Sequence, residues 1–291
     1  MNRRAFLAAA AAMAALPAWP SAERYEQGLL WRVTGPDGAA SHLYGTFQAP
    51  EEQLGRLPGE VLRSFEGATR LVVETRPDAY TTERFREAAT FGGRQTLAQI
   101  VGEADFGRAA ALLAEFGVPK DVVNKLKPWA ILLNLGALGG AQASPPDARL
   151  AALAEARALP IEPLEGLEEQ IFTFDEWPME SQVALLRHSL AHPAEIPQRA
   201  ERMLAAYLRG DLAGIVKAHE EHDARFAYLA PHQAVLTKRV LHDRNVVMVH
   251  RMQRGLRGGG SFVAIGALHL HGPKGVPALL EKAGYQLARV H

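Results

Sequence analysis

Residues 261–269 read Ser-Phe-Val-Ala-Ile-Gly-Ala-Leu-His, and this stretch decides the fold. Its apolar part, 262–265, predicts a buried strand, because a short apolar run bounded by turn residues is typical of a strand covered on both faces. A glycine-rich loop, a helix over 276–282 that stops at Gly284, and a strand over 286–290 follow. The order strand, loop, helix, strand is that of an α/β protein.

The same plan occurs near the start of the chain. Residues 43–48 read Leu-Tyr-Gly-Thr-Phe-Gln, so that Gly45 to Gln48 matches Gly266 to His269 position by position. A helix over 57–65 that stops at Gly67 and a strand over 71–74 come next. A strand at 29–33 precedes this unit, and the turn residues 35–38, Gly-Pro-Asp-Gly, predict a hairpin with 42–44. The chain therefore has two similar halves, each a strand, a Gly-x-x-His or Gly-x-x-Gln motif, a helix and a strand.

A helix-rich segment separates the two halves. Apolar residues at three- and four-residue spacing predict helices over 109–116, 129–138, 147–158, 182–190 and 199–208, with one short strand at 160–164. No linker divides this segment, so residues 23–291 are expected to form a single domain. Trp31 and Trp129 are expected in the core. His219 and His222, at helical spacing and next to the acidic residues 220, 221 and 223, are typical of a solvated helix face.

Composition narrows the function. The 291 residues are 48% hydrophobic and 22% charged, as in an ordinary globular chain. Lys plus Arg (32) equals Asp plus Glu (32), so no positive field favours nucleic acid. There is no cysteine, which excludes thiol nucleophiles and thiolate metal sites and leaves His, Asp, Glu and amide side chains as metal ligands.

The first 22 residues are typical of an export signal. Arg3-Arg4 precede an apolar run over 5–18 that is shorter than the roughly 20 residues of a spanning helix, and Pro17 and Pro20 lead to small residues at 21–22. The arginine pair favours the twin-arginine route. We therefore expect a periplasmic or secreted protein without a stable membrane span; a buried N-terminal helix is the alternative interpretation.

The ends of three strands carry the residues of greatest chemical interest. If the two echoing strands lie side by side, Gln48 and His269 emerge from their carboxyl ends into one crevice, which is where open α/β sheets bind ligands. Glu74 ends a third strand and can join them. A histidine, an amide and a carboxylate together can bind a divalent cation and a water molecule. The alternatives are a hydrogen-bonded structural histidine and a glutamate on the surface or at a helix cap.

The chain from about Leu30 to Val290 resembles the TraB/GumN family, which is related to the Tiki metalloproteases. The matching pieces, in order, are Trp-Arg-Val at 31–33, Leu-Tyr-Gly-Thr at 43–46, Leu-Val-Val-Glu at 71–74, Lys-Pro-Trp at 127–129, Pro-Leu-Glu at 163–165, Glu-Glu-Gln at 168–170, Gly-Asp at 210–211, Arg-Asn at 244–245, Gly-Ala-Leu-His-Leu at 266–270 with Gly272 and Gly275, and Gly-Tyr at 284–285. The resemblance implies a mixed central sheet flanked by helices, with two similar halves. It also implies a site for a divalent metal such as manganese or cobalt, and peptide hydrolysis.

Carried over residue by residue, the resemblance makes His269 the histidine of the second motif and Glu74 the nearby acid. Gln48 falls where the first motif has its histidine. We therefore predict a metal set of Gln48, Glu74 and His269, open to manganese, cobalt or zinc but weakened because an amide oxygen binds transition metals less well than an imidazole nitrogen. Glu74, His269 and Arg244 are the predicted catalytic residues, because an arginine can stabilise an oxyanion or hold a carboxylate.

Other residues near these motifs stay open as alternatives. His271 or His42 can replace the missing imidazole, and Glu165, at the end of another short strand, can reach the crevice or cap the next helix.

Three functions follow as hypotheses. The first is an exported, metal-dependent hydrolase in which the metal polarises a peptide carbonyl and Glu74 acts as ligand or base. The second is a non-catalytic protein that captures a peptide, a signal or a small ligand in the same crevice, and Gln48 supports it. The third is haem or iron binding, and no arrangement of Cys or Met ligands in the sequence supports it. The sequence leaves the oligomeric state open.

Overall fold

A six-stranded mixed sheet forms the centre of the computed structural model, which describes residues 25–49, 51–54, 56–76, 78–136 and 148–291. The strands are β1 (Leu30–Thr34), β2 (Ala40–Thr46), β3 (Arg70–Val73), β4 (Ile161–Pro163), β5 (Ser261–Gly266) and β6 (Gln286–Arg289). Their order is β4-β3-β5-β2-β1-β6. The export signal predicted over residues 1–22 lies outside the described residues.

The two echoing strands are neighbours, as predicted. β2 and β5 pair in parallel, with Gly45 opposite Ile265 and Thr46 opposite Gly266. β3 and β4 continue the parallel sheet beyond β5, while β1 forms the predicted hairpin with β2 and pairs with β6 on its other edge. Both pairings of β1 are antiparallel, so β1 alone of the six described strands runs against the others, and the expectation of a mixed sheet is confirmed.

Close packing at the end of β2 explains the glycine of the first motif. A Cβ on Gly45 would lie 2.7 Å from Leu270 Cδ1 and 3.2 Å from Ala267 Cα. The turn that follows β5, η4 (Ala267–Leu270), therefore packs directly on the β2 backbone. Glycine at this position lets the two motifs come together at one end of the sheet.

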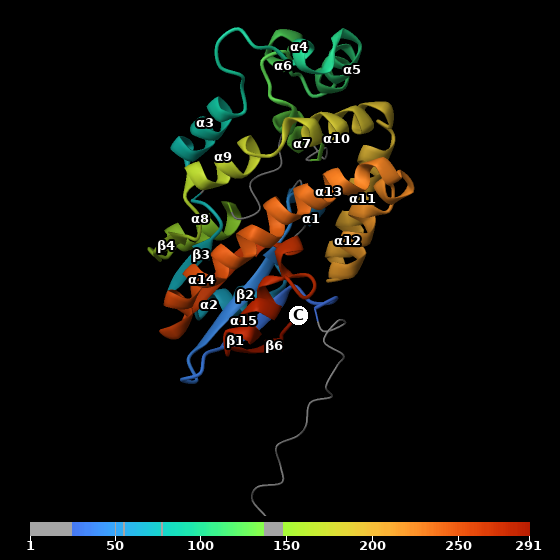
Figure 1. Ribbon diagram of the computed structural model, residues 1–291. Coiled ribbons are helices and arrows are strands. Elements are labelled where there is room, and N and C mark those ends of the chain that lie inside the picture. Colours follow the sequence, from blue (N-terminus) through green and yellow to red (C-terminus); the bar gives the residue numbers. More distant parts are fainter. Residues whose placement is uncertain (1–24, 50, 55, 77, 137–147) are drawn as a thin grey trace, which may run out of the picture.

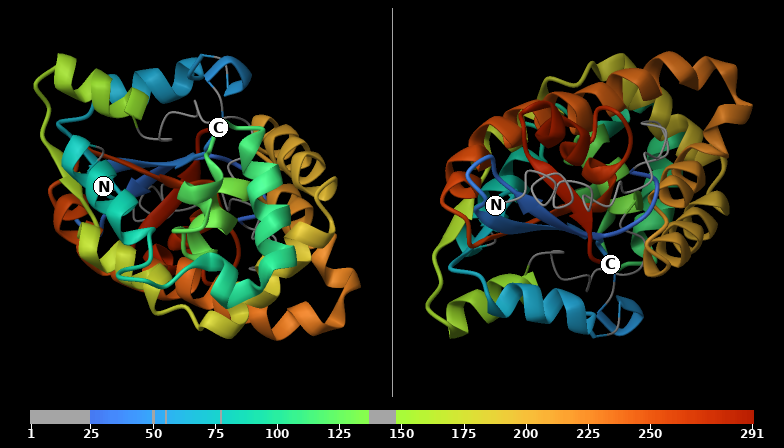
Figure 2. Two further views of the ribbon diagram at one scale, coloured as in Figure 1. Left: turned by 90° about the horizontal axis from the view of Figure 1, so that it is seen from above. Right: turned by 90° about the horizontal axis from the view of Figure 1, so that it is seen from below.

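Helices cover both faces of the sheet. α2 (Gly59–Glu66) and α8 (Ala148–Ala156) lie on one face, and α14 (Arg244–Arg257) and α15 (Val276–Lys282) lie on the other, as the two views along the sheet show (Figure 2). Leu71, Phe262 and Ile265, each fully buried, belong to the core that these layers share. β5 is buried along almost its whole length because it lies between two strands and two helical layers.

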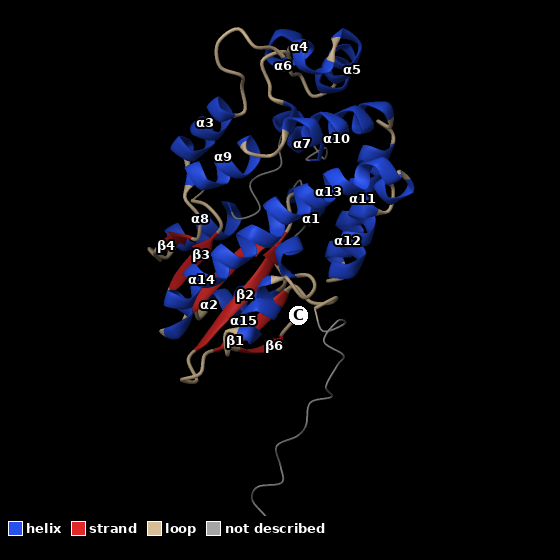
Figure 3. Cartoon of the chain, in the orientation of Figure 1, coloured by secondary structure: helices blue, strands red, loops and turns tan. Residues whose placement is uncertain are grey.

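The remaining helices gather beyond the carboxyl ends of the parallel strands (Figures 1 and 3). They are α1 (Glu51–Leu54), α3 (Ala79–Ala88), α4 (Leu97–Val101), α5 (Glu103–Ala114), α6 (Lys120–Val123), α7 (Pro128–Gly136), α9 (Leu167–Asp175), α10 (Met179–Ala191), α11 (Glu195–Leu208), α12 (Leu212–Glu220) and α13 (Ala230–Thr237), with the short turns η1 (Asp223–Arg225) and η2 (Ala227–Leu229). Two apolar clusters of their own stabilise this helical segment. Trp31 is buried in the sheet core and Trp129 in the helical core, as predicted.

One helical run connects this segment to the sheet. α13 passes through a π-helical stretch, η3 (Lys238–Asp243), directly into α14, so that the run extends from Ala230 to Arg257. π-helical stretches inside helices are frequent at functional sites. Among the described residues, no helix is both long and apolar enough to cross a membrane.

Candidate functional site

Four charged or titratable side chains meet beyond the carboxyl ends of the parallel strands. Glu74 directly follows β3, Glu165 comes shortly after β4, His269 lies on η4 after β5, and Arg244 begins α14. The sequence predicts that Glu74 and His269 share this edge, and the structure brings them together, with 3.7 Å between His269 Nε2 and Glu74 Oε1. We call these four residues the charged cluster.

Arg244 lies between the two carboxylates. Its Nη2 donates to Glu74 Oε2 and, at 2.6 Å, to Glu165 Oε2, and its Nε donates to Glu165 Oε1 at 3.0 Å. The side chains of Arg244, Glu74 and Glu165 are only 8%, 16% and 5% exposed. A guanidinium that is buried this far needs such partners, because an unpaired charge in the interior is costly. Glu165 thus reaches the crevice, one of its two expected positions.

His269 has a defined orientation. Its Nδ1 lies 2.6 Å from Asn245 Oδ1, and Asn245 Nδ2 donates to the Lys274 carbonyl at 2.8 Å. Because the amide oxygen can only accept, Nδ1 carries the proton and Nε2 keeps its lone pair. That lone pair faces Arg244 Nη1 at 3.4 Å. The successive residues Arg244 and Asn245 therefore position His269, each by contacting one of its ring nitrogens.

Electrostatics keep His269 neutral and Glu74 ionised. Burial lowers the pKa of His269, Glu74 opposes this effect and Arg244 adds to it, and the pKa that results is about 4. Burial by itself raises the pKa of Glu74, but His269, Arg244 and the Gly266 amide, which donates to Oε1 at 2.7 Å, together lower it to about 2. At neutral pH Glu74 is therefore ionised and His269 is neutral.

Gln48 lies in a different environment. It is exposed and lines a cavity of about 580 Å³ beyond the ends of β2 and β5, and neither Glu74 nor His269 is among the lining residues of that cavity. His271, the first alternative for the missing imidazole, lines the same cavity as Gln48. His42, the second alternative, pairs with Arg32 and Phe262 within the sheet, away from the strand ends.

This arrangement does not fit a divalent metal at Gln48, Glu74 and His269. The Arg244 guanidinium takes the place between the carboxylates where a cation would lie, and it also contacts the His269 lone pair. Both Glu74 oxygens already accept hydrogen bonds, from Gly266 and Arg244. Like charges repel at this distance, so a second cation is disfavoured while Arg244 stands there. We derive no chemical step through a metal at these residues.

The 580 Å³ cavity, which we call the main cavity, is bounded by the helical segment and by η4. Most of its lining is apolar: Trp129, Leu132, Leu133, Leu135, Phe174, Trp177, Leu185, Ile196, Met203, Val216, Leu236, Val240, Leu241 and Leu268. Twelve polar residues from several elements complete the lining, among them Gln48, Arg199, Asn245 and His271. Its size and lining are those of small-molecule and peptide sites.

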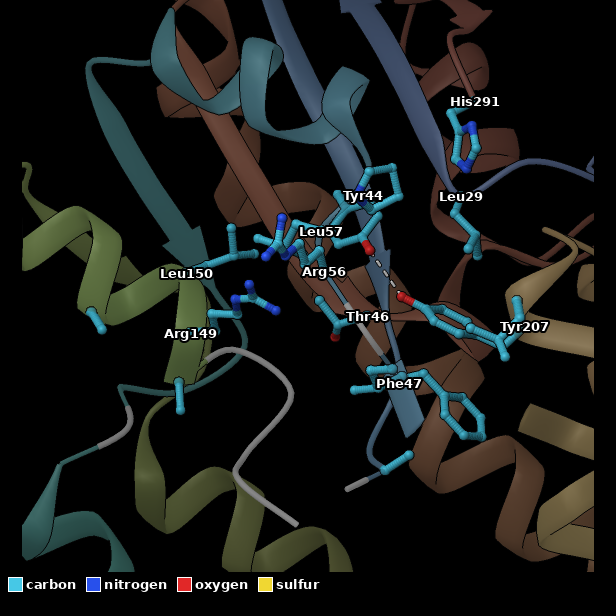
Figure 4. A pocket seen from close by; sticks show the side chains of 16 residues that line it. Leu29, Tyr44, Thr46, Phe47, Arg56, Leu57, Arg149, Leu150, Tyr207 and His291 are labelled. Atoms are coloured by element: carbon cyan, nitrogen blue, oxygen red, sulfur yellow. Dashed lines mark hydrogen bonds between the residues drawn. The ribbon is translucent and has the colours of Figure 1, made fainter. Parts of the chain in front are cut away.

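Two smaller spaces lie nearby. Arg244 and Glu165 line a cavity of about 190 Å³ with Phe172 and Arg239, so the charged cluster borders this smaller cavity and not the main cavity. Another cavity, of about 450 Å³, includes Tyr44, Thr46, Phe47 and Tyr207, and the hydroxyls of Tyr44 and Tyr207 lie 2.9 Å apart (Figure 4). The successive side chains Phe47 and Gln48 thus line two different cavities, as expected for extended backbone at a strand end.

The structure corrects the expectation for the histidines near residue 220. His222 and Asp223 are 5% and 6% exposed, whereas a solvated helix face was predicted. α12 ends at Glu220 and the chain tightens into η1, which turns both side chains inward. His219 is half-buried and lines the main cavity.

His222 meets His188 and His192. Each of the three offers a ring nitrogen, and these nitrogens all lie within 4.8 Å of one another, so the described part of the chain contains a group that can hold a metal ion. Sequence reasoning did not single out His188 and His192. Their spacing of four residues, which places two ligands on one helix face, is the signal that points to them.

The fold and the site define an α/β protein in which a helical segment covers the carboxyl end of a mixed sheet. A buried arginine–carboxylate–histidine cluster lies at that end. The chain belongs to the TraB/PrgY/gumN family, whose model matches residues 29–289. It is 24% identical over 253 residues to "Uncharacterized protein YbaP" of Shigella flexneri, covering 85% of this chain and 90% of that protein. The protein of the same name from Escherichia coli (strain K12) matches with the same identity and coverage.

Proposed function

We propose that this protein is an exported ligand-binding member of its family, which captures an apolar peptide segment or a small amphipathic molecule in the main cavity. The observation that carries the proposal is the cavity itself: about 580 Å³, lined mainly by apolar side chains and opening beside Gln48. Trp177, whose buried indole N–H has no hydrogen-bond partner among the described residues, also lines it and offers a donor to a ligand.

The charged cluster supports binding rather than hydrolysis. Its arginine is neutralised by two carboxylates, and its one free lone pair, on His269 Nε2, faces that arginine. Gln48, which occupies the position of the missing imidazole, faces the cavity instead, where an amide can donate to and accept from a ligand. The cluster then acts as a rigid wall that holds Asn245 in place beside the ligand.

A cavity-filling variant with a matched control tests the proposal. Ala200 lines the cavity from α11, whereas Ala205 lies on the exposed side of the same helix. We expect the amphipathic dye 1-anilinonaphthalene-8-sulfonate, and members of an apolar peptide library, to bind the mature protein and to change the fluorescence of Trp129 and Trp177. Ala200→Phe should weaken binding at least tenfold and Ala205→Phe should not. Equal binding by both variants would remove the cavity as the site.

Metal-dependent peptide hydrolysis is the rival hypothesis, and the meeting of Glu74 with His269 favours it. It predicts manganese, cobalt or zinc in protein purified without chelator or histidine tag, lost in His269→Ala and increased in Gln48→His, together with peptide cleavage. The binding proposal predicts that neither variant changes metal content and that no peptide is cleaved. A Soret band in protein from haem-replete cells would instead identify haem as the occupant.

Export is part of the proposal and rests on residues 1–22. Cell fractionation and N-terminal sequencing of the mature chain test it: we expect periplasmic or secreted protein beginning close to residue 23. A cytoplasmic protein that still begins at Met1 would contradict it.

A further inference from the structure

A second set of titratable side chains lies in the helical segment, between Glu165 and Arg244 in the sequence. His188 lies on α10, His192 caps the end of that helix, and His222 and Asp223 lie where α12 passes into η1. The ring centroids of the histidines are 4.4 Å apart for His188 and His192, and 5.1 Å apart for each of these with His222. Phe226 packs against all three rings, at 4.6 to 5.2 Å.

Buried polar atoms without hydrogen-bond partners concentrate here. They are His188 Nε2, both ring nitrogens of His222, and Asp223 Oδ1, on side chains that are each more than nine-tenths buried. Asp223 Oδ1 lies 3.4 Å from His188 Nε2, while Asp223 Oδ2 accepts from Gln233 and, at 3.4 Å, from Arg199. Leaving buried polar groups unsatisfied costs free energy, so such a concentration calls for a ligand.

The outer nitrogens of two of the histidines have hydrogen-bond partners that set their orientation. His192 Nδ1 lies 3.0 Å from the His188 carbonyl, and His188 Nδ1 lies 2.9 Å from the Tyr228 hydroxyl. His222 Nδ1 makes no hydrogen bond, but Glu195 Oε2 lies 3.4 Å from it. Metal-bound histidines usually donate their second N–H to a carbonyl, hydroxyl or carboxylate in this way, which leaves Nε2 as the ligand atom.

From this geometry we propose that His188, His192, His222 and Asp223 bind one divalent transition-metal ion of the zinc type. Three imidazoles and a carboxylate are a ligand set that zinc accepts in tetrahedral geometry. Zinc–nitrogen bonds of about 2.1 Å put two ligands of one ion about 3.4 Å apart, so ligand nitrogens that lie within 4.8 Å of one another need to approach by at most about 1.4 Å. The proposal does not rest on the ligand-binding function.

The proposed ion has a structural consequence. His188 and Asp223 also line the main cavity, so the metal would form part of its wall. By joining α10 to the turn between α12 and η1, it would hold together two elements that border the cavity from separate parts of the sequence. Metal binding therefore stabilises the folded chain, by an amount that rises with the logarithm of the free metal concentration once that concentration exceeds Kd.

The test uses the mature chain without a histidine tag, stripped by chelator and titrated with Zn²⁺ or Co²⁺. We expect one ion per chain, the visible absorption of tetrahedral Co²⁺, and a Tm that rises with Zn²⁺. His192→Phe keeps the aromatic packing and removes one ligand, and it should weaken binding at least tenfold and abolish the Tm shift. His222→Phe should do the same, whereas the exposed His250→Ala should bind as the unchanged chain does.

Three outcomes would overturn the proposal. They are no uptake by the stripped protein, undiminished uptake by both His192→Phe and His222→Phe, and loss of the metal in His269→Ala alone. The last would place the ion at the charged cluster.

Discussion

Arg244 is the residue on which the buried charges depend. It is the shared partner of Glu74 and Glu165, which lie 170 and 79 residues away in the sequence. Arg244→Met keeps much of the side-chain volume but leaves two buried carboxylates unpaired, and we expect it to lower the free energy of unfolding by about 3–5 kcal/mol. Urea denaturation measures this loss.

Arg251→Met is the matched control on the same helix. Its ion pair with Glu169 is largely exposed, at 38% and 53%, so its loss should cost about 1 kcal/mol or less. Equal losses in the free energy of unfolding for the two variants would show that burial of the charged cluster adds nothing to the stability of the protein.

His269 makes stability depend on pH. Burial lowers its pKa to about 4 from the ordinary value of 6.5, so the unfolded chain binds a proton more readily than the folded one. The resulting stabilisation is fully present above about pH 6.5 and is lost as the pH falls toward 4, by at most about 3 kcal/mol. Glu74, with a pKa lowered to about 2, loses its own contribution at still lower pH, below about 4.5.

Urea denaturation at a series of pH values checks this slope. His269→Gln should reduce the slope of the curve between pH 6.5 and 4, whereas His250→Gln, on the exposed side of α14, should keep it. Part of the slope should remain, because burial also lowers the pKa of His42, His188, His219, His242 and His271. An unchanged slope in His269→Gln would assign the whole pH dependence to these other groups.

At the level of single residues, sequence patterns found the groups that directly follow strands. Glu74 and His269 each follow an apolar run, and parallel strands bring their carboxyl ends to one edge of a sheet. The inward turn of His222 was missed, because helical spacing continues the α12 pattern two residues past the point where the helix ends.

Among the elements, the turn between η4 and α15 depends on a glycine. A Cβ on Gly275 would lie 2.6 Å from the carbonyl oxygens of both Leu270 and His271, and backbone atoms cannot move aside as a flexible side chain can. We expect Gly275→Ala to destabilise the protein by about 1–3 kcal/mol, as overpacking does. Thermal or urea unfolding measures it.

Gly107 provides the opposite case. It lies within α5 with nothing within 4 Å of an added Cβ, so Gly107→Ala should stabilise the helix by about 0.5–1 kcal/mol. If both alanine variants change stability in the same direction, close packing is not what Gly275 provides.

The elements of both halves follow from local patterns. The hairpin, the strand at β5 and the helix over 276–282 are confirmed close to their predicted bounds. The pairing of the halves is less symmetrical than their sequences. β3 pairs with β5 and not with β2, the strand that precedes it in the chain, because β5 is inserted between β2 and β3. β6, the strand that follows β5, pairs with β1 instead.

For the whole molecule, the helical segment creates the main cavity. Its helices cover the sheet end where the two motifs meet (Figure 1). The main cavity lies between these helices and η4. Apolar residues that lie far apart in sequence, such as Trp129, Met203 and Leu268, line one space. Single-sequence patterns identify each as core-like, since burial against a cavity and burial in a core require the same apolar side chains.

The sequence by itself determined the α/β class, the family, and the edge of the sheet at which Glu74 and His269 meet. It could do so because strand and helix periodicity, turn glycines and motif order are local properties of the chain. Only the tertiary structure decided that Arg244 neutralises Glu74 and Glu165, that Gln48 faces a separate cavity, and that three histidines converge beside Asp223. Those contacts join residues tens to more than a hundred positions apart, and their geometry follows from the packing of whole helices against the sheet.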